Sequence, residues 1–283
     1  MRVIHPKKQP EVKPKRRPPK ASLLVLLLTV VGISAFLVLR AHTSEAPAQD
    51  NVTSTVTQNI SEIPKKGTLK TFTGQQFKEL YNSFAYPNTQ YIGENTPITG
   101  NDAADGRIRQ VAVARGYQLR SAPVTSAFQD VGQGYLLQQR AAQPWLDLVA
   151  EAKKDGITIR LTAAYRSAED QKQLFITHLQ RLAIPAEAIP SGAYDGQISQ
   201  ALRTTAIPGY SRHHTGYTID ISCENMPTSS FQFTSCFKWL SADNYKKAKT
   251  HGWIPSYPDG AGEQGPDPES WEYVWVGVDA VTE

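Results

Sequence analysis

The sequence predicts an α+β domain, in which a small and mostly antiparallel sheet is flanked by helices, preceded by one transmembrane helix. Three observations support this prediction. From residue 141 onward, some segments have apolar residues at helical spacing and others have alternating apolar and polar residues, as in strands. The expected strands are short and mostly joined by hairpins. An uncharged run of eighteen residues lies near the start of the chain. The 283 residues are 40% hydrophobic, which is enough for a sizeable core.

Positive charge is concentrated at the start of the chain. The first 20 residues hold eight Lys or Arg residues and one acidic residue, whereas the other 263 hold 22 basic and 25 acidic residues. We expect residues 1–21 to form a basic cytoplasmic tail. The rest of the chain is not basic, so nucleic acid is not an expected partner.

The uncharged run SLLVLLLTVVGISAFLVL covers residues 22–39. About 20 apolar residues cross a bilayer as a helix, whereas the core of a signal peptide usually has about 7–15. We therefore expect residues 22–39 to be a signal anchor in the cell membrane, with everything after it outside the cytoplasm. A cleaved signal peptide stays open, because small residues follow in SEAPAQD, and so does a buried helix of a soluble core.

Two regions follow the anchor. Residues 40–71 are polar and rich in Ser and Thr, which is typical of a flexible tether. Residues 72–138 should form the N-terminal part of the exported domain, with helices over 74–85 and 101–116, the second capped by Asn101 or Asp102. No motif assigns a role to this part.

The pattern is sharper in the main domain, residues 139–283. Apolar residues recur at helical spacing over 141–156, and ITIRLTAA then alternates as a strand. Ser167 is suited to cap the next helix, within 165–182. The other expected elements are helices over 195–205 and 236–253, a strand at the end of 206–222 and a closing strand over 269–278.

Cys223 and Cys236 are the only cysteines, thirteen residues apart, and both lie after the expected anchor. Outside the cytoplasm such a pair tends to oxidise, and closing a loop of this size contributes roughly 3 kcal/mol in the chain-entropy model. We expect a disulfide. Two thiolate metal ligands are the alternative, although the spacing fits no C-x-x-C pattern.

The stretch PGYSRHHTGYTIDI carries the pattern S-x-H-x-x-G-x-x-x-D, formed by Ser211, His213, Gly216 and Asp220. A histidine on a loop and an aspartate entering the next strand can converge on one metal ion, and glycine between them permits the bend. A polar loop that runs into a strand would account for the same residues without a metal.

This stretch resembles the signature of the VanY-type zinc D-alanyl-D-alanine carboxypeptidases, whose superfamily includes L,D-carboxypeptidases and the hedgehog signalling domain. Three further blocks resemble the family in the same order, namely AAYRSAEDQ, FKWLSADNYKKAKTHGWIPSYP and ESWEYVWVG, the last at the place of the family's E-P-W-H-x-R-Y-V-G. The resemblance implies a hedgehog/D,D-peptidase-like fold, with residues 139–283 as the peptidase domain.

The resemblance also implies a role for individual residues. His213 and Asp220 would bind Zn²⁺, and Glu269 would be the catalytic base. Arg166 would hold the terminal carboxylate of the substrate, which suits its planar guanidinium. Neutral hydrogen bonds to the same peptide end would come from Ser167, Gln171 and Ser211.

Glu272 is the main departure from the family pattern, because it stands where the family has its third zinc ligand, a histidine. Three interpretations stay open. Glu272 binds zinc through a carboxylate oxygen, which is an ordinary zinc ligand. Another histidine replaces it, with His214, His178 and His251 as candidates. In the third, the metal is weak or absent and the domain only binds peptide.

The expected function is therefore a zinc-dependent carboxypeptidase that removes the C-terminal D-alanine from peptidoglycan stem peptides. The alternatives are an L,D-carboxypeptidase or a peptidoglycan endopeptidase of the same superfamily, and a metal-free pseudoenzyme. The expected partners are the stem peptide and the membrane, the latter through residues 22–39.

Overall fold

The structure is a computed structural model that describes residues 67–91 and 96–283. The predicted tail 1–21, the anchor 22–39 and the tether up to residue 66 lie outside the described residues. Among the residues that are described, no helix has the length and apolar character that crossing a membrane requires.

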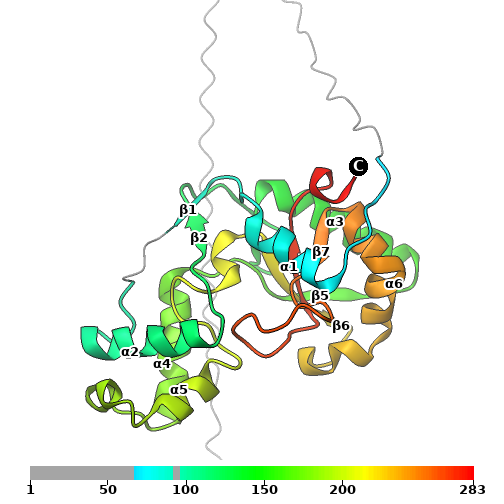
Figure 1. Cartoon of the computed structure of the whole chain (residues 1–283). Coiled ribbons are helices and arrows are strands. Elements are labelled where there is room, and N and C mark those ends of the chain that lie inside the picture. The colour runs from blue at the N-terminus through cyan, green and yellow to red at the C-terminus, as the bar shows by residue number, and fades with distance from the viewer. Residues whose placement is uncertain (1–66, 92–95) are drawn as a thin grey trace, which may run out of the picture. The chain divides into compact units, whose positions relative to one another are not determined.

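The described residues contain a four-stranded antiparallel sheet (Figure 1). The strand order is β5-β6-β8-β7, and every neighbouring pair is antiparallel. The α+β class with a small antiparallel sheet is thus confirmed, but the expected hairpins are not found in this sheet, because helices or a long loop join its strands. The strands are β5 (Ile159–Ala163), β6 (Thr218–Cys223), β7 (Trp253–Pro255) and β8 (Glu272–Trp275).

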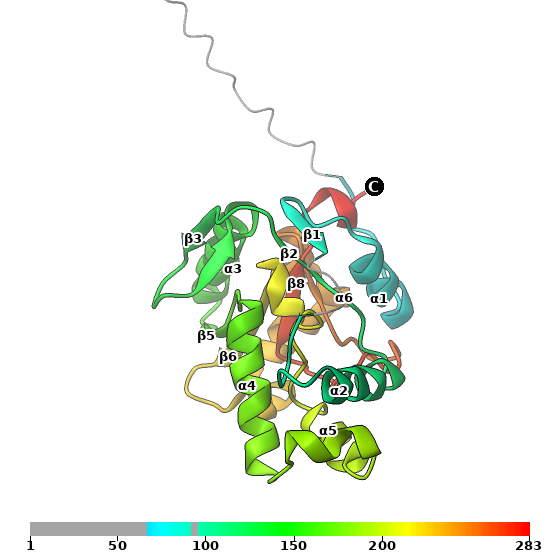
Figure 2. The same ribbon diagram turned by 90° about the vertical axis from the view of Figure 1, so that its left-hand side faces the viewer.

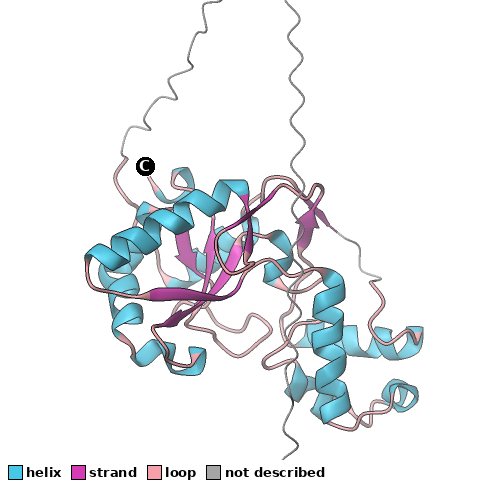
Figure 3. Ribbon diagram, turned by 180° about the vertical axis from the view of Figure 1, so that it is seen from behind, coloured by secondary structure: helices cyan, strands magenta, loops and turns pink. Residues whose placement is uncertain are grey.

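Helices surround the sheet, and a second group of helices lies beside it (Figures 2 and 3). Side-chain caps begin several of these helices, including the predicted cap Ser167, and Asn101 is the residue that caps α2. The α-helices are α1 (Gly74–Ser83), α2 (Asp102–Ala114), α3 (Gln139–Lys154), α4 (Ala168–Arg181), α5 (Asp195–Ala201) and α6 (Ser235–Thr250). The short 3-10 helices are η1 (Ala186–Ser191), η2 (Arg212–Thr215), η3 (Thr228–Phe233) and η4 (Asp279–Val281).

Two hydrophobic clusters hold these layers together. The larger cluster packs α1, α3 and α6 against the sheet, and its largest fully buried side chain is Trp253. The smaller cluster joins α2, α4, α5 and η1 through residues such as Ile108 and Phe175. The pocket described below is lined by Tyr117 and Tyr210 of the smaller cluster and by Asp220 and Glu272 on strands of the sheet.

The expected helix over 236–253 differs from the structure. Residues 243–245 within α6 have φ between 50° and 59°, which is the left-handed region, so two helical pieces meet at a kink. Asn244 stabilises this kink, because its side chain bonds both the backbone N–H and the carbonyl of Phe72. The prediction of a continuous helix was wrong at this point.

Five short strands were also missed by the sequence analysis. Each has three residues, too few to display an alternation of apolar and polar side chains. Besides β7, they form two antiparallel pairs: β1 (Thr89–Tyr91) with β2 (Ser121–Pro123), and β3 (Phe128–Asp130) with β4 (Leu136–Gln138).

Two features connect distant parts of the chain. The expected disulfide is present between Cys223, at the end of β6, and Cys236 in α6. At the other end of the described chain, Leu69 forms an antiparallel bridge with Thr282. The last residues of the predicted tether, 67–71, therefore lie against the C-terminal segment of the domain.

Candidate metal centre and substrate pocket

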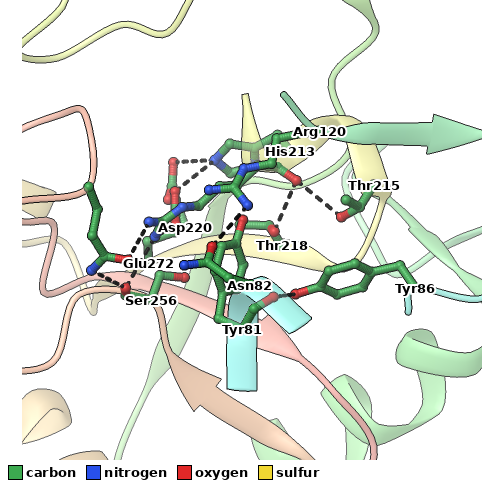
Figure 4. Close-up of polar contacts among 12 residues, drawn as sticks. Tyr81, Asn82, Tyr86, Arg120, His213, Thr215, Thr218, Asp220, Ser256 and Glu272 are labelled. Carbon is green, nitrogen blue, oxygen red and sulfur yellow. Dashed lines mark hydrogen bonds and ion pairs between the residues drawn. The ribbon is translucent and has the colours of Figure 1, made fainter. Parts of the chain in front are cut away.

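His213, Asp220 and Glu272 come together from three different elements, η2, β6 and β8 (Figure 4). His213 Nε2 lies 3.3 Å from Asp220 Oδ2 and 3.6 Å from Glu272 Oε2. One ligand atom from each residue lies within 4.8 Å of the other two. The three residues can therefore share one metal ion.

The register of the sheet brings the two carboxylates together. Asp220 on β6 is directly opposite Glu272 on β8, and their neighbours in these strands are buried. Like charges directly opposite each other destabilise a sheet. This pairing therefore calls for positive charge close to both side chains.

The turn before β6 aims the imidazole at these carboxylates. His213 is buried, and its Nδ1 donates to the carbonyl of Ala164 at 2.8 Å. That bond leaves the lone pair of Nε2 directed at the two carboxylates, which is the tautomer that a metal ligand requires. Burial by itself lowers the pKa of His213, but the charges of Asp220 and Glu272 outweigh it and raise the pKa.

Gly216 ends this turn, and the position demands glycine. Its φ is +75°, and a Cβ there would lie 2.8 Å from the ring of Phe128. The sequence pattern therefore has a local structural cause, because the glycine lets the chain turn from His213 into the strand that carries Asp220.

The donor set suits zinc. Imidazole nitrogen and carboxylate oxygen are both ordinary zinc ligands. Asp220 Oδ1 is buried and has no hydrogen-bond partner within the described part of the chain. A buried polar atom without a partner is costly, and an ion at this place would satisfy it.

Arg212 binds the other side of the Glu272 carboxylate. Its Nη1 lies 3.1 Å from Glu272 Oε1, and both side chains are only 4% exposed. Glu272 thus has one oxygen paired with a guanidinium, while its other oxygen faces His213.

A pocket of about 110 Å³ opens beside this cluster. Glu269 lies on its wall, half-buried, three residues before Glu272. Burial raises the pKa of the Glu269 carboxyl well above its usual range, and the negative charges of Glu272 and Asp220 raise it further. A carboxyl with a raised pKa can both accept and return a proton near neutral pH.

The predicted substrate-binding residues take two kinds of position. Arg166 and Ser211 line the pocket. Gln171 is fully buried behind Arg166, where its Oε1 accepts from Arg166 at 2.9 Å and its Nε2 donates to the carbonyl of Ala206. Ser167 caps α4 by accepting from the N–H of Asp170. Gln171 thus contacts Arg166 and Ser167 contacts the start of α4, and neither residue lines the pocket.

His214, next to His213 in sequence, has a different environment. Its Nδ1 donates to the carbonyl of Arg166, and its Nε2 accepts from the N–H of Gly209. Burial lowers the pKa of His214 to about 4, so the ring stays neutral and links these two backbone segments. It holds Arg166 in place and lies outside the metal cluster.

The other two candidate histidines also lie outside the cluster. His178 on α4 contacts the hydroxyl of Thr205, and His251 at the end of α6 contacts Glu151 on α3. Of the interpretations left open by the sequence, the geometry therefore favours Glu272 as the third ligand over a substitute histidine.

Sequence reasoning missed several residues of this site. Arg212 is the main one, although it stands between Ser211 and His213 in the motif, and a charged residue inside such a motif was a usable signal. Arg120 and Tyr117 also line the pocket and come from the N-terminal part of the domain, where no motif marks them. Tyr257 and Gln264 reach the pocket from the long loop between β7 and β8.

Two curated proteins are similar to this chain. A D-alanyl-D-alanine carboxypeptidase of Enterococcus faecalis is 24% identical over 191 residues, which cover 67% of this chain and 66% of that protein. The putative carboxypeptidase YodJ of Bacillus subtilis is 27% identical over 143 residues, which cover 48% of this chain and 44% of that protein. The chain thus spans less than two thirds of the length of either relative.

Solved structures with a similar chain include VanYB in complex with D-alanine-D-alanine, at 22% identity and a TM-score of 0.44, covering 56% of this chain and 84% of that one. The LdcB LD-carboxypeptidase has 24% identity and a TM-score of 0.42, with 56% and 68% covered. A mutant of the vancomycin resistance D,D-pentapeptidase VanY in complex with Zn(II) has 21% identity and a TM-score of 0.42, with 58% and 83% covered.

The family comparison covers the sheet, the cluster and the pocket wall that carries Glu269. The model of the VanY family, described as D-alanyl-D-alanine carboxypeptidase, matches residues 134–278, just over half of the chain. The match includes all four strands of the central sheet and the four motif blocks identified in the sequence. The chain belongs to the VanY family of carboxypeptidases.

Proposed function

We propose that this protein is a zinc-dependent carboxypeptidase that removes the terminal D-alanine from peptidoglycan stem peptides. The observation that carries the proposal is the convergence of His213, Asp220 and Glu272 beside a pocket that also holds Glu269 and Arg166. Membership of the family and the name of the relative from Enterococcus faecalis support the choice of substrate.

Zinc would be held by His213 Nε2, one oxygen of Asp220 and Oε2 of Glu272. Three protein ligands are the usual number at a catalytic zinc site. When bound, the ion would lower the pKa of water and polarise the peptide carbonyl. Two carboxylate ligands bring more negative charge to the ion than one. The positive charge of Arg212 next to Glu272 would offset part of that negative charge.

Glu269 would move the proton. Its raised pKa suits a group that takes a proton from the attacking water and then gives it to the departing amine. The departing amine is the amino group of the released D-alanine, and the shortened stem peptide ends in a new carboxylate. The same carboxyl acts first as a base and then as an acid.

Arg166 would bind the free carboxylate of the substrate. A guanidinium binds a carboxylate through two parallel hydrogen bonds, which explains a preference for the last residue of a peptide. Gln171 on its side chain and His214 on its backbone carbonyl keep Arg166 oriented toward the pocket.

We also propose that the domain works outside the cytoplasm, attached to the membrane by residues 22–39. The disulfide between Cys223 and Cys236 supports an oxidising location. Peptidoglycan stem peptides are found there as well. Fractionating cells that express the full chain, followed by alkaline extraction, tests this proposal, because an anchored protein stays with the membrane pellet whereas a cleaved one is released.

The substrate proposal is tested by incubating the purified full chain with zinc and a defined stem pentapeptide that ends in D-Ala-D-Ala. We expect release of one free D-alanine and no further trimming of the resulting tetrapeptide. A tetrapeptide incubated separately checks for L,D-carboxypeptidase activity, and a cross-linked dimer checks for endopeptidase activity.

The matched control is the same pentapeptide with an amidated C-terminus, which removes the carboxylate that Arg166 binds. Amidation should abolish release of the last residue. Equal release from the amidated peptide would contradict the role of Arg166, and release only from the tetrapeptide would replace the D,D-carboxypeptidase proposal with the L,D alternative.

A further inference from the structure

Arg212 neither binds the metal nor moves a proton in the chemistry proposed above, yet its charge is buried and closely surrounded beside the pocket. Its guanidinium bonds Glu272 Oε1 at 3.1 Å, the carbonyl of Ser256 at 3.2 Å and Gln264 Oε1 at 2.9 Å. Gln264 also donates to the same carbonyl of Ser256. Figure 4 shows Glu272 and Ser256 within this network.

Two aromatic rings enclose the same guanidinium. Its central carbon lies 4.4 Å from the ring centre of Tyr81 and 4.0 Å from that of Tyr257. Arg120 stacks on Tyr81 as well, at 4.7 Å. Cation–π contacts of this kind favour a desolvated guanidinium that is held in one orientation.

Tyr81 belongs to α1, which lies before the region matched by the family model. The N-terminal part of the domain, to which no sequence motif assigns a role, therefore contributes directly to the surroundings of Arg212. It reaches the metal cluster through this stacked ring and not through a ligand of its own.

The orientation of Glu272 follows from these contacts. Arg212 binds Oε1, so the carboxylate is turned with Oε2 toward His213 Nε2, 3.6 Å away. A long carboxylate side chain without such a partner would have several rotamers available, and only some of them would direct an oxygen at the ion. The guanidinium thus selects the rotamer that binds metal through one oxygen.

The charge balance also depends on Arg212. A zinc dication with the carboxylates of Asp220 and Glu272 has no net charge, and the guanidinium of Arg212 brings the buried cluster to a single positive charge. A site with one carboxylate and two neutral imidazoles reaches the same charge without an arginine. Glutamate at position 272 and arginine at position 212 therefore act together as a replacement for a neutral ligand.

We propose that Arg212 is a positioning residue that makes Glu272 a competent metal ligand, and that Tyr81 and Tyr257 hold it there. The inference rests on the proposed zinc site but does not depend on which peptide is cleaved. It assigns the Arg212–Glu272 pair as one functional unit, so the effect of changing either residue depends on the identity of the other.

The test is a set of four full-length proteins: unmodified, Arg212→Gln, Glu272→His, and both changes together. Zinc affinity is measured by competition with a chromogenic chelator, without substrate. In the unmodified background, Arg212→Gln should weaken zinc binding about 10–100-fold, as loss of a group that orients a ligand does. In the Glu272→His background the same change should strengthen zinc binding, because it removes a buried positive charge that no longer has a carboxylate partner.

This reversal of sign separates the proposal from a merely structural role. A loss of affinity of equal size in both backgrounds, or no change in either, would overturn the inference while leaving the zinc peptidase intact. If the unmodified protein itself binds no zinc, both the inference and the proposed function fail.

Folding is checked by circular dichroism for all four proteins. Should Arg212→Gln fail to fold, Arg212→Lys and Tyr81→Leu serve in its place. The first keeps the positive charge but loses the planar guanidinium, and the second removes one of the two stacked rings. Each is expected to weaken zinc binding more in the protein that keeps Glu272 than in the Glu272→His protein. The opposite order would contradict the proposal.

Discussion

Two regions of this molecule combine the same three chemical groups, a histidine, a carboxylate and a cation. In the pocket, His213 faces Asp220 and Glu272, with Arg212 behind them. Between α3 and α6, His251 lies 2.6 Å from Glu151, which also binds Lys247 at 2.7 Å.

The two regions differ in burial and in how completely their polar atoms are satisfied. The side chains of His213 and Glu272 are 5% and 4% exposed, whereas those of His251, Glu151 and Lys247 are partly exposed, at 16%, 30% and 36%. In the buried cluster, Asp220 Oδ1 has no partner in the part of the chain that the structure describes. In the exposed cluster, both oxygens of Glu151 are bonded.

The difference shows what distinguishes a reactive site from an ordinary ion cluster. Water screens the exposed cluster, so its pairs stabilise the fold only slightly. The buried cluster has two carboxylates side by side, an Asp220 oxygen without a partner among the described residues, and a pocket beside it, which are the features that a bound cation would require.

Glu269→Gln should have the largest effect on activity. The amide keeps the shape of the side chain but cannot transfer the proton, and general acid–base groups contribute about 10²–10⁴-fold to rate. We expect kcat on the pentapeptide to fall by that factor while zinc content stays unchanged. A variant that retains full kcat would exclude Glu269 as the proton carrier.

Arg166→Ala should act on substrate binding. A hydrogen bond to a charged group contributes about 1.5–3 kcal/mol, which corresponds to roughly 10- to 150-fold in kcat/KM. The measurement is kcat/KM for the free-acid and the amidated pentapeptide. The variant should lose its discrimination between the two, and a variant that still prefers the free acid would contradict the assignment.

Removing the disulfide should reduce stability without changing the site. Cys223 and Cys236 are separated by thirteen positions, for which the chain-entropy model gives about 3 kcal/mol. The double variant Cys223→Ser with Cys236→Ser should therefore lose about that much free energy of unfolding in a denaturant titration. Zinc affinity measured under native conditions should remain as in the unmodified protein.

The exposed cluster should give the smallest effect. Burial acts to raise the pKa of Glu151, but hydrogen bonds from Lys247 and His251 outweigh it, so the pKa in the folded protein is lowered. A lowered pKa contributes stability above the unfolded pKa, and this contribution is lost as the pH falls through the folded pKa. Glu151→Gln should reduce stability by at most about 1 kcal/mol at pH 7 and by less at acid pH.

The control for this last variant is Asp147→Asn on the same helix, since Asp147 takes part in no ion pair among the described residues. Unfolding curves for both variants from neutral to acid pH make the comparison. A stability loss in Glu151→Gln that grew as the pH fell would have the wrong sign for this account.

The larger elements could be predicted from the sequence because their signals are local. Capping residues such as Ser167 and Asn101 and the helical spacing of apolar residues are visible without a structure. The kink in α6 was missed because a left-handed backbone at Asp243 and Asn244 is stabilised by Phe72, which is far away in sequence. A contact between residues so far apart in sequence does not change the spacing of apolar residues, so the sequence pattern does not reveal it.

In the site, too, residues with a local sequence signal could be predicted, whereas features that depend on distant contacts could not. The motif identified His213 and Asp220, and the block match aligned Glu272 with a ligand position. The direct opposition of Asp220 and Glu272 is a matter of strand register, which spacing along the chain does not reveal. Arg212 and Tyr81 were missed for a similar reason, because their importance comes from packing against residues that are distant in sequence.

The central claim is that the buried cluster binds zinc and the exposed one does not. The most direct measurement is the zinc content of three dialysed, folded proteins: unmodified, Glu272→Ala and, as the matched control, Glu151→Ala. We expect one zinc per chain in the unmodified protein and in Glu151→Ala, and a clear loss in Glu272→Ala. Full zinc content in Glu272→Ala, or its loss in Glu151→Ala, would contradict it.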